Sequence, residues 1–326
     1  MPDDAVWITE QDATEAIDLT EAIDEIGAAF AREHAGVVTP LDKTHALWGG
    51  SHTLHALGAI DTEIGLAGTK TWCHTAGGAT PLLLLWDADT GQLRAVIEAF
   101  VLGQLRTAAV SGVATRALAA PDARTLAIIG SGKQALAQVA TVLNVRDIDR
   151  VAVYSRTPEN RDAFAAKVAD LAPEVTVSVA DSADEAADGA HVITTITRST
   201  TPFLHADALS AGVHLNAVGA ISLERAELDA GIIREASIVC ADSVPAAQAL
   251  AAELRDASEV LPLSAVVADP TRRTSNAGWS VFKAMGVGLA DLALGHQILR
   301  RVVASGGGRP VPQPTKAAPR LMKGRG

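Results

Sequence analysis

The stretch "RTLAIIGSGKQALAQVATVLN", residues 124–144, decides the fold. An apolar run typical of a buried strand ends at two glycines, and a segment with helical periodicity follows at once. In a dinucleotide-binding unit the first glycine permits the tight turn, the second lets backbone N–H groups approach a pyrophosphate, and a small residue lets the helix pack on the strand. The strand before the loop and the helix after it favour such a unit over an ordinary turn. We expect the loop to bind a dinucleotide through Gly130, Ser131, Gly132, Gln134 and Ala135.

Strand and helix patterns alternate after residue 123. Apolar strand patterns recur at residues 150–156, 174–180, 191–197, 213–219 and 237–242, with a helical pattern at 159–172. This alternation predicts an α/β fold with a doubly wound parallel sheet, a Rossmann domain over residues 121–284. The stretch "SVFKAMGVGLADLALGHQILRRVV", residues 280–303, has one long helical pattern that lies too far along the chain to belong to the repeat of the sheet.

The region before residue 120 has a different texture and predicts an α+β domain. Residues 9–34 favour two short helices with acidic starts, and residues 52–60 and 64–73 favour strands. Residues 80–99 predict a hairpin whose turn spans 87–91, and a helix at 107–120 is stopped by Pro121.

The composition excludes several classes of protein. The 326-residue chain has 48% hydrophobic and 20% charged residues, as expected of a globular protein. Its formal net charge of −11 argues against a nucleic-acid partner, because phosphate binding needs a basic face. The tail, residues 306–326, is basic and rich in Pro and Gly without apolar periodicity, and we predict that it is disordered.

The two cysteines, Cys73 and Cys240, lie far apart and show no CxxC spacing, which favours a reducing compartment over a disulfide framework. The acidic N-terminus lacks the positive region of a signal peptide, and no apolar run reaches the about eighteen residues of a membrane span. We therefore expect a cytoplasmic protein without a membrane partner.

The end of the second strand selects between nicotinamide cofactors. An NAD site places an acid there for the ribose 2′-hydroxyl, whereas this chain has Ser155, Arg156 and Thr157, with no acid until Glu159. An arginine with two hydroxyls suits a 2′-phosphate, so we expect NADP(H) to be preferred over NAD(H). The alternative is an ordinary solvated arginine. Further cofactor contacts are expected from Thr195, Thr197, Val218 and Lys283.

Lys70, in "GTKTWCHT" at residues 68–75, stands among small and apolar neighbours on an expected strand. A half-buried cation costs free energy unless an anion meets it. Either an acidic side chain of the protein or a ligand is that anion.

The chain resembles the ornithine cyclodeaminase/mu-crystallin family up to about residue 305. The motifs behind the resemblance, in order, are "GTKTW", "QLRTAAVSGVAT", "IIGSGKQA", "YSRTPEN", "HLNAVGA" and "SVFKAMGVGLAD". The resemblance implies a homodimer, a substrate-binding and dimerisation domain at residues 1–120, and a Rossmann domain at 121–284. It also implies a C-terminal helix, residues 285–305, that returns to the first domain.

The resemblance gives Lys70 and Arg106 a shared role, which is to bind the α-carboxylate of the substrate beside the nicotinamide. Lys70 could also donate the proton that hydride addition to an imine requires, and a lysine that merely snorkels to solvent is the alternative. The family often has a third, arginine ligand after a proline near position 43. Here either Lys43 replaces that arginine, without its planar fork, or Asp42 has displaced it.

Four histidines crowd the same region. His55 is a candidate for the substrate site, and His55 or His74 could be an acid near the imine, although a structural role is also open. Because His52 and His55 point to opposite faces of a strand, they cannot chelate one metal ion, and we expect no metal site.

Cyclodeaminating members of the family carry an aspartate just after "NAVG", where this chain has Ala220, Ile221 and Ser222. Without that carboxylate, deamination loses its general base. The sequence therefore favours an NAD(P)H-dependent reductase of α-imino acids, reversible as an amino-acid or N-alkyl-amino-acid dehydrogenase. A cyclodeaminase with bound NAD, and a mu-crystallin-like protein that only binds small molecules, are the alternatives.

Overall fold

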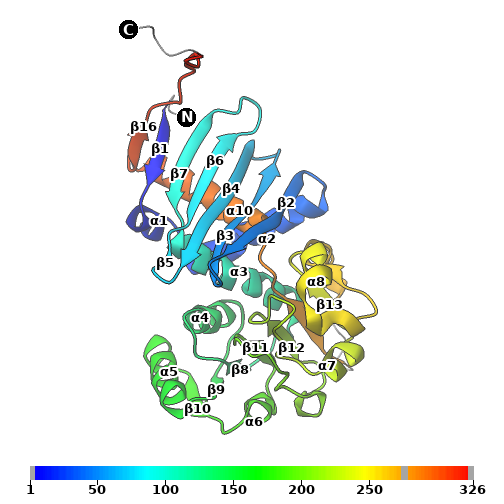
Figure 1. Cartoon of the computed structure of the whole chain (residues 1–326). Helices are drawn as coiled ribbons and strands as arrows, with labels where there is room; N and C mark the ends of the chain where they lie inside the picture. Colours follow the sequence, from blue (N-terminus) through cyan, green and yellow to red (C-terminus); the bar gives the residue numbers. More distant parts are fainter. Residues whose placement is uncertain (1–3, 273–277, 322–326) are drawn as a thin grey trace.

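Two sheets of eight strands organise the described residues, 4–272 and 278–321, of the computed structural model (Figure 1). The first is mostly antiparallel, in the order β16-β1-β7-β6-β4-β3-β2 with β5 paired to β4. The second runs β10-β9-β8-β11-β12-β15-β13-β14, and its paired strands are parallel. This confirms the predicted fold class, a Rossmann-type parallel sheet joined to an α+β region.

The first sheet is built mainly from the start of the chain. Its strands are β1 (Ala5–Ile8), β2 (Val38–Trp48), β3 (His52–Asp61), β4 (Leu66–Thr75), β5 (Gly78–Ala79), β6 (Leu82–Asp87), β7 (Leu93–Glu98) and β16 (Arg309–Val311). The helices beside it are α1 (Glu10–Ala16), α2 (Leu19–His34), α3 (Phe100–Leu118) and α10 (Gly288–Ala304). Thr9 and Asp18 begin α1 and α2 with capping boxes, which explains the two acidic starts in the sequence.

Glycines let α10 lie directly on this sheet, where it contacts β3, β4 and α2. A Cβ added to Gly288 would lie 2.3 Å from the carbonyl oxygen of Gly58 on β3. A Cβ added to Gly68 on β4 would lie 3.0 Å from a methyl group of Leu292. The absence of a side chain at Gly288 lets two backbones approach closely, and its absence at Gly68 leaves room for the Leu292 side chain.

The parallel sheet has helices on both faces. Its strands are β8 (Thr125–Ile129), β9 (Arg150–Tyr154), β10 (Thr176–Val179), β11 (Val192–Thr195), β12 (His214–Ala217), β13 (Ile238–Ala241), β14 (Leu261–Pro262) and β15 (Ser280–Lys283). Its helices are α4 (Ala135–Val145), α5 (Pro158–Leu171), α6 (Ala183–Ala187), α7 (Ala230–Glu235), α8 (Val244–Leu250) and α9 (Leu263–Ala268), with short 3₁₀ helices at Ala206–Ala208, Ala252–Asp256 and Pro270–Arg272. Along β8, Leu126 and Ile128 pack in one hydrophobic cluster while Ala127 and Ile129 pack in another, so both faces are buried.

Two segments differ from the sequence predictions. Residues 280–283 do not begin the long helix, since they form β15 between β12 and β13, and α10 begins only at Gly288. The apolar run fits a central strand as well as a helix, and the two neighbouring strands decide. The tail is not irregular from residue 306 onward, because Arg309–Val311 pairs with β1 and so covers an edge of the first sheet.

In the described part of the chain, no helix combines the length and apolar character needed to cross a membrane. Cys73 and Cys240 are both free thiols, the first exposed and the second buried.

Candidate active site

Lys70 occupies a core-facing position of β4 and is 4% exposed. Strand alternation places its side chain on the same face as Leu66 and Gly68, toward α10. Its Nζ donates a hydrogen bond to Oδ1 of Asp291, a fully buried residue in the first turn of α10. An acidic side chain therefore meets Lys70, and two further N–H donors of the ammonium remain for a ligand.

Arg106, on α3, approaches the same carboxylate. Its Nε lies 3.4 Å from Oδ1 of Asp291, and its side chain is 14% exposed. The guanidinium also lies against Gly286, where an added Cβ would lie 3.2 Å from Nη1. Gly286 also has a φ of +87°, a conformation that favours glycine. Both this backbone conformation and the nearby guanidinium therefore favour glycine at position 286. Asp291 thus brings together the two cations that the sequence analysis paired.

Lys43 joins the same cluster of charges from β2. It lies in an irregularity of the β2–β3 register, which can re-aim a side chain. Burial lowers its pKa, and the charge of Arg106 lowers it further, while Asp242 and Asp291 raise it. The structure therefore brings Lys43, Lys70 and Arg106 into one electrostatic environment.

Asp242 ties this cluster to the parallel sheet. It follows β13, is buried, and accepts hydrogen bonds from the backbone N–H groups of Met285 at 2.7 Å and Gly286 at 2.8 Å. Burial raises the pKa of Asp242, against these hydrogen bonds and the charge of Arg106. Both segments leave the carboxyl ends of neighbouring parallel strands, where open α/β sheets bind their ligands.

Lys70 titrates near neutral pH. Burial lowers the pKa of its ammonium to about 8, with Asp291 raising it and Arg106 lowering it. A lysine with such a pKa can act as a general acid or base in this pH range.

His55 belongs to an aromatic stack across β2, β3 and β4. Its ring stacks on that of Trp72, with centroids 4.7 Å apart, and on that of His45 at 5.6 Å. The Trp72 ring centroid lies 5.3 Å from Nζ of Lys70, so the stack runs up to the cationic cluster. Nε2 of His55 lies 2.8 Å from Oγ1 of Thr53.

Burial lowers the pKa of His55 to about 4, and the nearby charge of Lys43 contributes. The imidazole is therefore neutral at physiological pH, and it makes a flat wall rather than a charged proton donor. Within the described ranges, no three His, Cys, Asp or Glu side chains are grouped so that they could bind a metal ion.

The glycine loop has the shape that a pyrophosphate requires. Gly130 has a φ of +120°, and a Cβ there would lie 2.5 Å from the carbonyl oxygen of Ile196. An added Cβ at Gly132 would meet no atom within 4 Å, so this backbone faces open space. Helix α4 begins at Ala135, which is buried, and its N-terminus directs partial positive charge toward the loop. The residues present fit the phosphates of a dinucleotide.

The end of β9 lies beside the glycine loop. Oγ of Ser131 in the glycine loop donates to Oγ of Ser155 at 2.9 Å, which joins the loop to the second strand. Arg156 and Thr157 follow and are exposed, ahead of the first turn of α5. Their place beside the glycine loop is that of the groups that contact the adenosine ribose in such folds.

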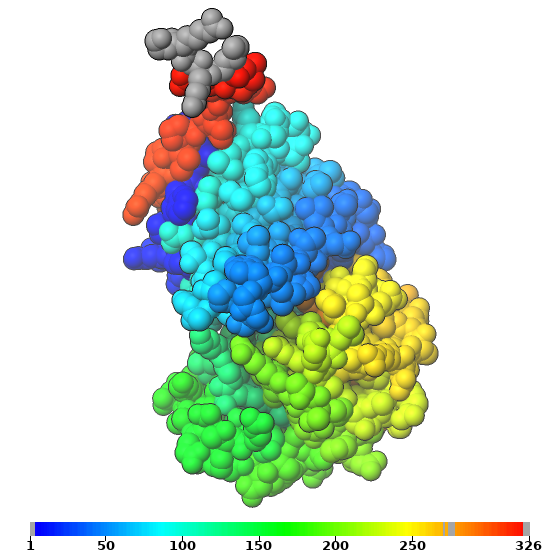
Figure 2. Space-filling model, in the orientation of Figure 1, coloured from blue at the N-terminus to red at the C-terminus, as the bar shows by residue number. Residues whose placement is uncertain are grey.

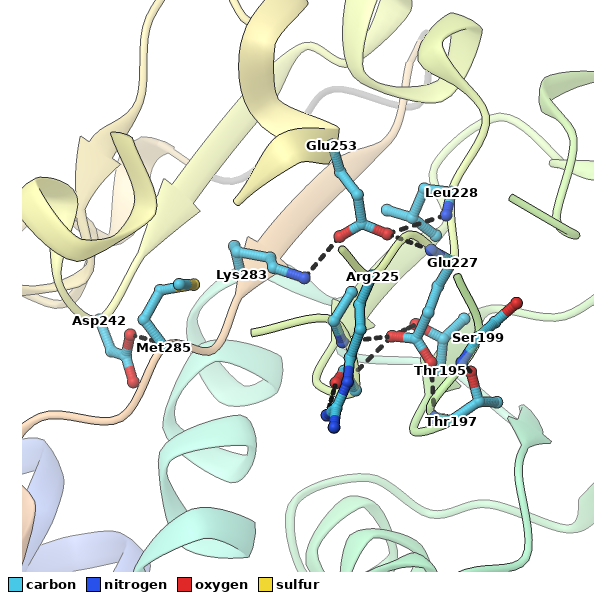
Figure 3. A network of polar contacts seen from close by, with 12 residues as sticks. Thr195, Thr197, Ser199, Arg225, Glu227, Leu228, Asp242, Glu253, Lys283 and Met285 are labelled. Atoms are coloured by element: carbon cyan, nitrogen blue, oxygen red, sulfur yellow. Dashed lines mark hydrogen bonds and ion pairs between the residues drawn. The ribbon is translucent and has the colours of Figure 1, made fainter. Parts of the chain in front are cut away.

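Thr195 and Thr197 lie at the end of β11 (Figure 3), and Val218 directly follows the neighbouring strand β12. The N–H of Val218 donates to the carbonyl oxygen of Thr195 at 2.9 Å. Oγ1 of Thr195 and the N–H of Thr197 both donate to the carboxylate of Glu227, at 3.0 and 2.5 Å. Glu227 is buried and was missed from the sequence, where an acid in "RAELD" gives no signal of burial.

Lys283 does not share this position. Its side chain is fully buried, and its Nζ donates to Glu253 at 2.5 Å, as Figure 3 shows. The other oxygen of Glu253 accepts the backbone N–H groups of Glu227 and Leu228. The ammonium of Lys283 already has an acidic partner inside the protein, which does not support the prediction that this side chain binds the cofactor.

Residues 220–222, directly after "NAVG", carry no carboxylate. Glu227 reaches this segment and accepts the backbone N–H groups of Gly219 at 2.8 Å and Ala220 at 3.2 Å. With these donors and those of the two threonines, its oxygens serve to hold the loops in place. Glu227 is therefore no substitute for the absent general base.

The comparisons with known proteins show the family of this chain. The chain matches the ornithine cyclodeaminase/mu-crystallin family over residues 4–306. It belongs to that family. Relatives in the family include a Δ1-pyrroline-2-carboxylate reductase of Bacillus cereus (strain ZK / E33L), 33% identical over 237 residues that cover 70% of this chain and 72% of the relative. An iminosuccinate reductase of Paracoccus denitrificans is 30% identical over 294 residues, covering 86% of this chain and 90% of the relative.

Solved structures with the same fold include that of the iminosuccinate reductase of Paracoccus denitrificans in complex with NAD⁺. It has a TM-score of 0.87 with 24% identity, and the match covers 94% of this chain and 99% of the other. At that identity the match establishes the shared fold.

Proposed function

We propose that this protein is an NAD(P)H-dependent reductase of α-imino acids that works in reverse as an amino-acid or N-alkyl-amino-acid dehydrogenase. The observation that carries the proposal is the buried cluster in which Lys70 and Arg106 share Asp291. Lys43 and Asp242 interact with the same cluster, and the remaining N–H donors of Lys70 and Arg106 suit the α-carboxylate of a substrate. Relatives named as imine reductases support the same reaction class.

When bound, NAD(P)H supplies the hydride that adds to the imine carbon. Lys70 and Arg106 hold the α-carboxylate and so fix the adjacent C=N bond against the nicotinamide. The imine nitrogen takes one proton as the carbon takes the hydride, and a pKa of about 8 suits Lys70 for the role of proton donor. His55 and Trp72 make a flat wall for the rest of the substrate.

We propose that NADP(H) is preferred, because Arg156 and Thr157 are exposed at the ribose end of the cofactor site and no acid stands there. Gly130, Ser131, Gly132, Gln134 and Ala135 would hold the pyrophosphate, Ser155 the ribose, and Thr195, Thr197 and Val218 the nicotinamide half.

Cyclodeamination remains the second candidate because the family contains it, and a protein that only binds small molecules is the third. The absence of a carboxylate at residues 220–222, with Glu227 fully engaged, favours reduction. The test is NADPH consumption with Δ1-pyrroline-2-carboxylate, and with pyruvate plus methylamine. Reduction of either supports the proposal. Ammonia release from ornithine without net NADPH use, or binding without turnover, contradicts it.

We further propose a homodimer formed through the first sheet. Trp48 and Leu54, on one face of the β2–β3 hairpin, are 44% and 49% exposed, and β2 is an edge strand. Figure 2 shows this segment, in blue, at the surface. Exposed apolar side chains beside an open edge are typical of an interface.

The two free thiols support a reducing compartment, and we propose the cytoplasm.

A further inference from the structure

Asp291 contacts both cations of the proposed active site, and the three residues lie on three different elements. Lys70 lies on β4 and Arg106 on α3, whereas Asp291 lies on α10. A single oxygen, Oδ1, accepts from Nζ of Lys70 and lies 3.4 Å from Nε of Arg106. The side chain of Asp291 is 1% exposed, so bulk water does not compete for this oxygen.

The position of Asp291 is fixed by backbone packing. Gly288, one turn before it, lies against the backbone of Gly58 on β3, and Leu292, next to it, lies against Gly68 on β4. The first contact is between two backbones and the second is made by a side-chain methyl group, and together they leave the helix little room to shift along the sheet. The carboxylate is therefore held at one place relative to Lys70.

The charges that face Lys70 come from three elements, and they do not balance without Asp291. Arg106 on α3 and Lys43 on β2 both disfavour the charged ammonium, while Asp291 on α10 favours it. Asp242, the other acid of the cluster, acts on Arg106 and Lys43. Trp72, on the same strand as Lys70, adds the face of an aromatic ring.

We propose that Asp291 is the positioning residue of this site: it keeps the Lys70 ammonium charged and aimed beside Arg106, so that two charged groups meet the substrate carboxylate at neutral pH. The inference rests on the proposed function for its kinetic test. Asp291 acts through Lys70 and Arg106.

The expected signature is a shift in the pH dependence of reduction. If the reaction needs Lys70 charged, kcat/KM is full below the pKa of about 8 and falls as the pH rises through it. Asp291→Asn removes the opposing charge, which lowers the pKa of Lys70. The decrease of kcat/KM at alkaline pH, called the alkaline fall below, should therefore move to lower pH by about one to three units.

The experiment measures kcat/KM for Δ1-pyrroline-2-carboxylate against pH in the wild type and three variants. Asp291→Asn should show the shift with NADPH binding retained, and Asp291→Glu, which keeps the charge, should keep the alkaline fall near that of the wild type. Asp61→Asn is the matched control, because Asp61 is also a buried acid of the first sheet, and its partner is Arg32 at 2.7 Å. It should leave the fall where it is.

An alkaline fall at the same pH in wild type and Asp291→Asn overturns the proposal, and so does an equal shift in Asp61→Asn.

Thermal unfolding gives an independent test that requires no activity. Since Asp291→Asn leaves the buried amino group of Lys70 without its acidic partner, the double variant Lys70→Met/Asp291→Asn should be more stable than Asp291→Asn alone. A double variant no more stable than the single overturns the proposal. A wild type that reduces no imine contradicts the proposed function, and the unfolding comparison still decides the role of Asp291.

Discussion

At the scale of single residues, Lys70 takes a place in β4 that strand alternation assigns to a core side chain. Asp291 offsets the free-energy cost of burying the Lys70 ammonium. The same burial would strengthen the bond to a substrate carboxylate, because a charge-assisted hydrogen bond is stronger where water is excluded. The cation was visible in the sequence. Its partner was not, although an acid within the buried apolar run of residues 288–295 is a signal that could have been read.

We expect Lys70→Ala to lower kcat/KM for imino acids by one to two decades, since a charge-assisted contact contributes about 1.5–3 kcal/mol. NADPH binding should stay nearly intact. An imine without a carboxylate separates the two roles of Lys70. A pure carboxylate anchor makes this substrate poor with the wild type and little worse with the variant, whereas a proton donor makes the variant fail with both. Full activity of Lys70→Ala on every imino acid would contradict both roles.

Arg156 is the second residue whose change should be read directly in kinetics. Arg156→Asp replaces a cation by an acid that can accept from a ribose 2′-hydroxyl, so the preference for NADPH over NADH should fall by about 10- to 100-fold. Steady-state kcat/KM for each cofactor measures it. Lys133, in the glycine loop and also a cation, offers a comparison: Lys133→Ala should leave the ratio closer to that of the wild type. Equal kcat/KM values for the two cofactors in the wild type would be evidence against a 2′-phosphate site.

At the scale of elements, the approach of α10 to the first sheet decides whether the site exists. Gly288→Ala places a Cβ at 2.3 Å from the backbone of Gly58, which forces the helix away from the sheet. We expect a loss of stability of about 1–3 kcal/mol, with a lower kcat/KM because Asp291 moves away from Lys70.

The matched control is Gly27→Ala on α2, where an added Cβ would meet only Val113 at an ordinary 3.8 Å. This change should be neutral or stabilising by up to about 1 kcal/mol. Thermal unfolding and kcat/KM for both variants test the comparison. A Gly288→Ala variant as stable and active as the wild type would contradict the tight packing of α10.

At the scale of the whole molecule, the exposed apolar face of the β2–β3 hairpin predicts a dimer. Leu54→Asp puts a charge into that face and should convert the dimer into a monomer, as measured by light scattering at micromolar concentration. Leu171→Asp on α5, at a similarly exposed leucine of the parallel-sheet half, should leave the mass unchanged. A monomeric wild type, or equal masses for wild type and Leu54→Asp, would argue against this interface.

The candidate site also belongs to the whole molecule, because its charges come from both sheets. Lys43 and Lys70 are on strands of the first sheet, Asp242 follows a strand of the second, and Asp291 is on the helix that returns from the second to the first. No local stretch contains them.

The sequence by itself determined the features that depend on neighbouring residues. The glycine loop between a buried strand and a helix, the hairpin turn at residues 87–91 and the capped starts of α1 and α2 are local, since φ angles, side-chain caps and short-range periodicity fix them. The family motifs added the prediction that Lys70 and Arg106 act together, and the structure shows both beside Asp291.

Only the tertiary structure decided the features that depend on distant partners. Residues 280–283 are a strand because β12 and β13 lie on either side of them, and residues 309–311 are a strand because β1 leaves an edge to pair with. Lys283 is turned inward by Glu253, and Lys70 is charged because a helix that begins more than two hundred residues later brings Asp291 to it. Burial and electrostatic pairing are set by what packs nearby in space, and that information is not contained in any local pattern of the chain.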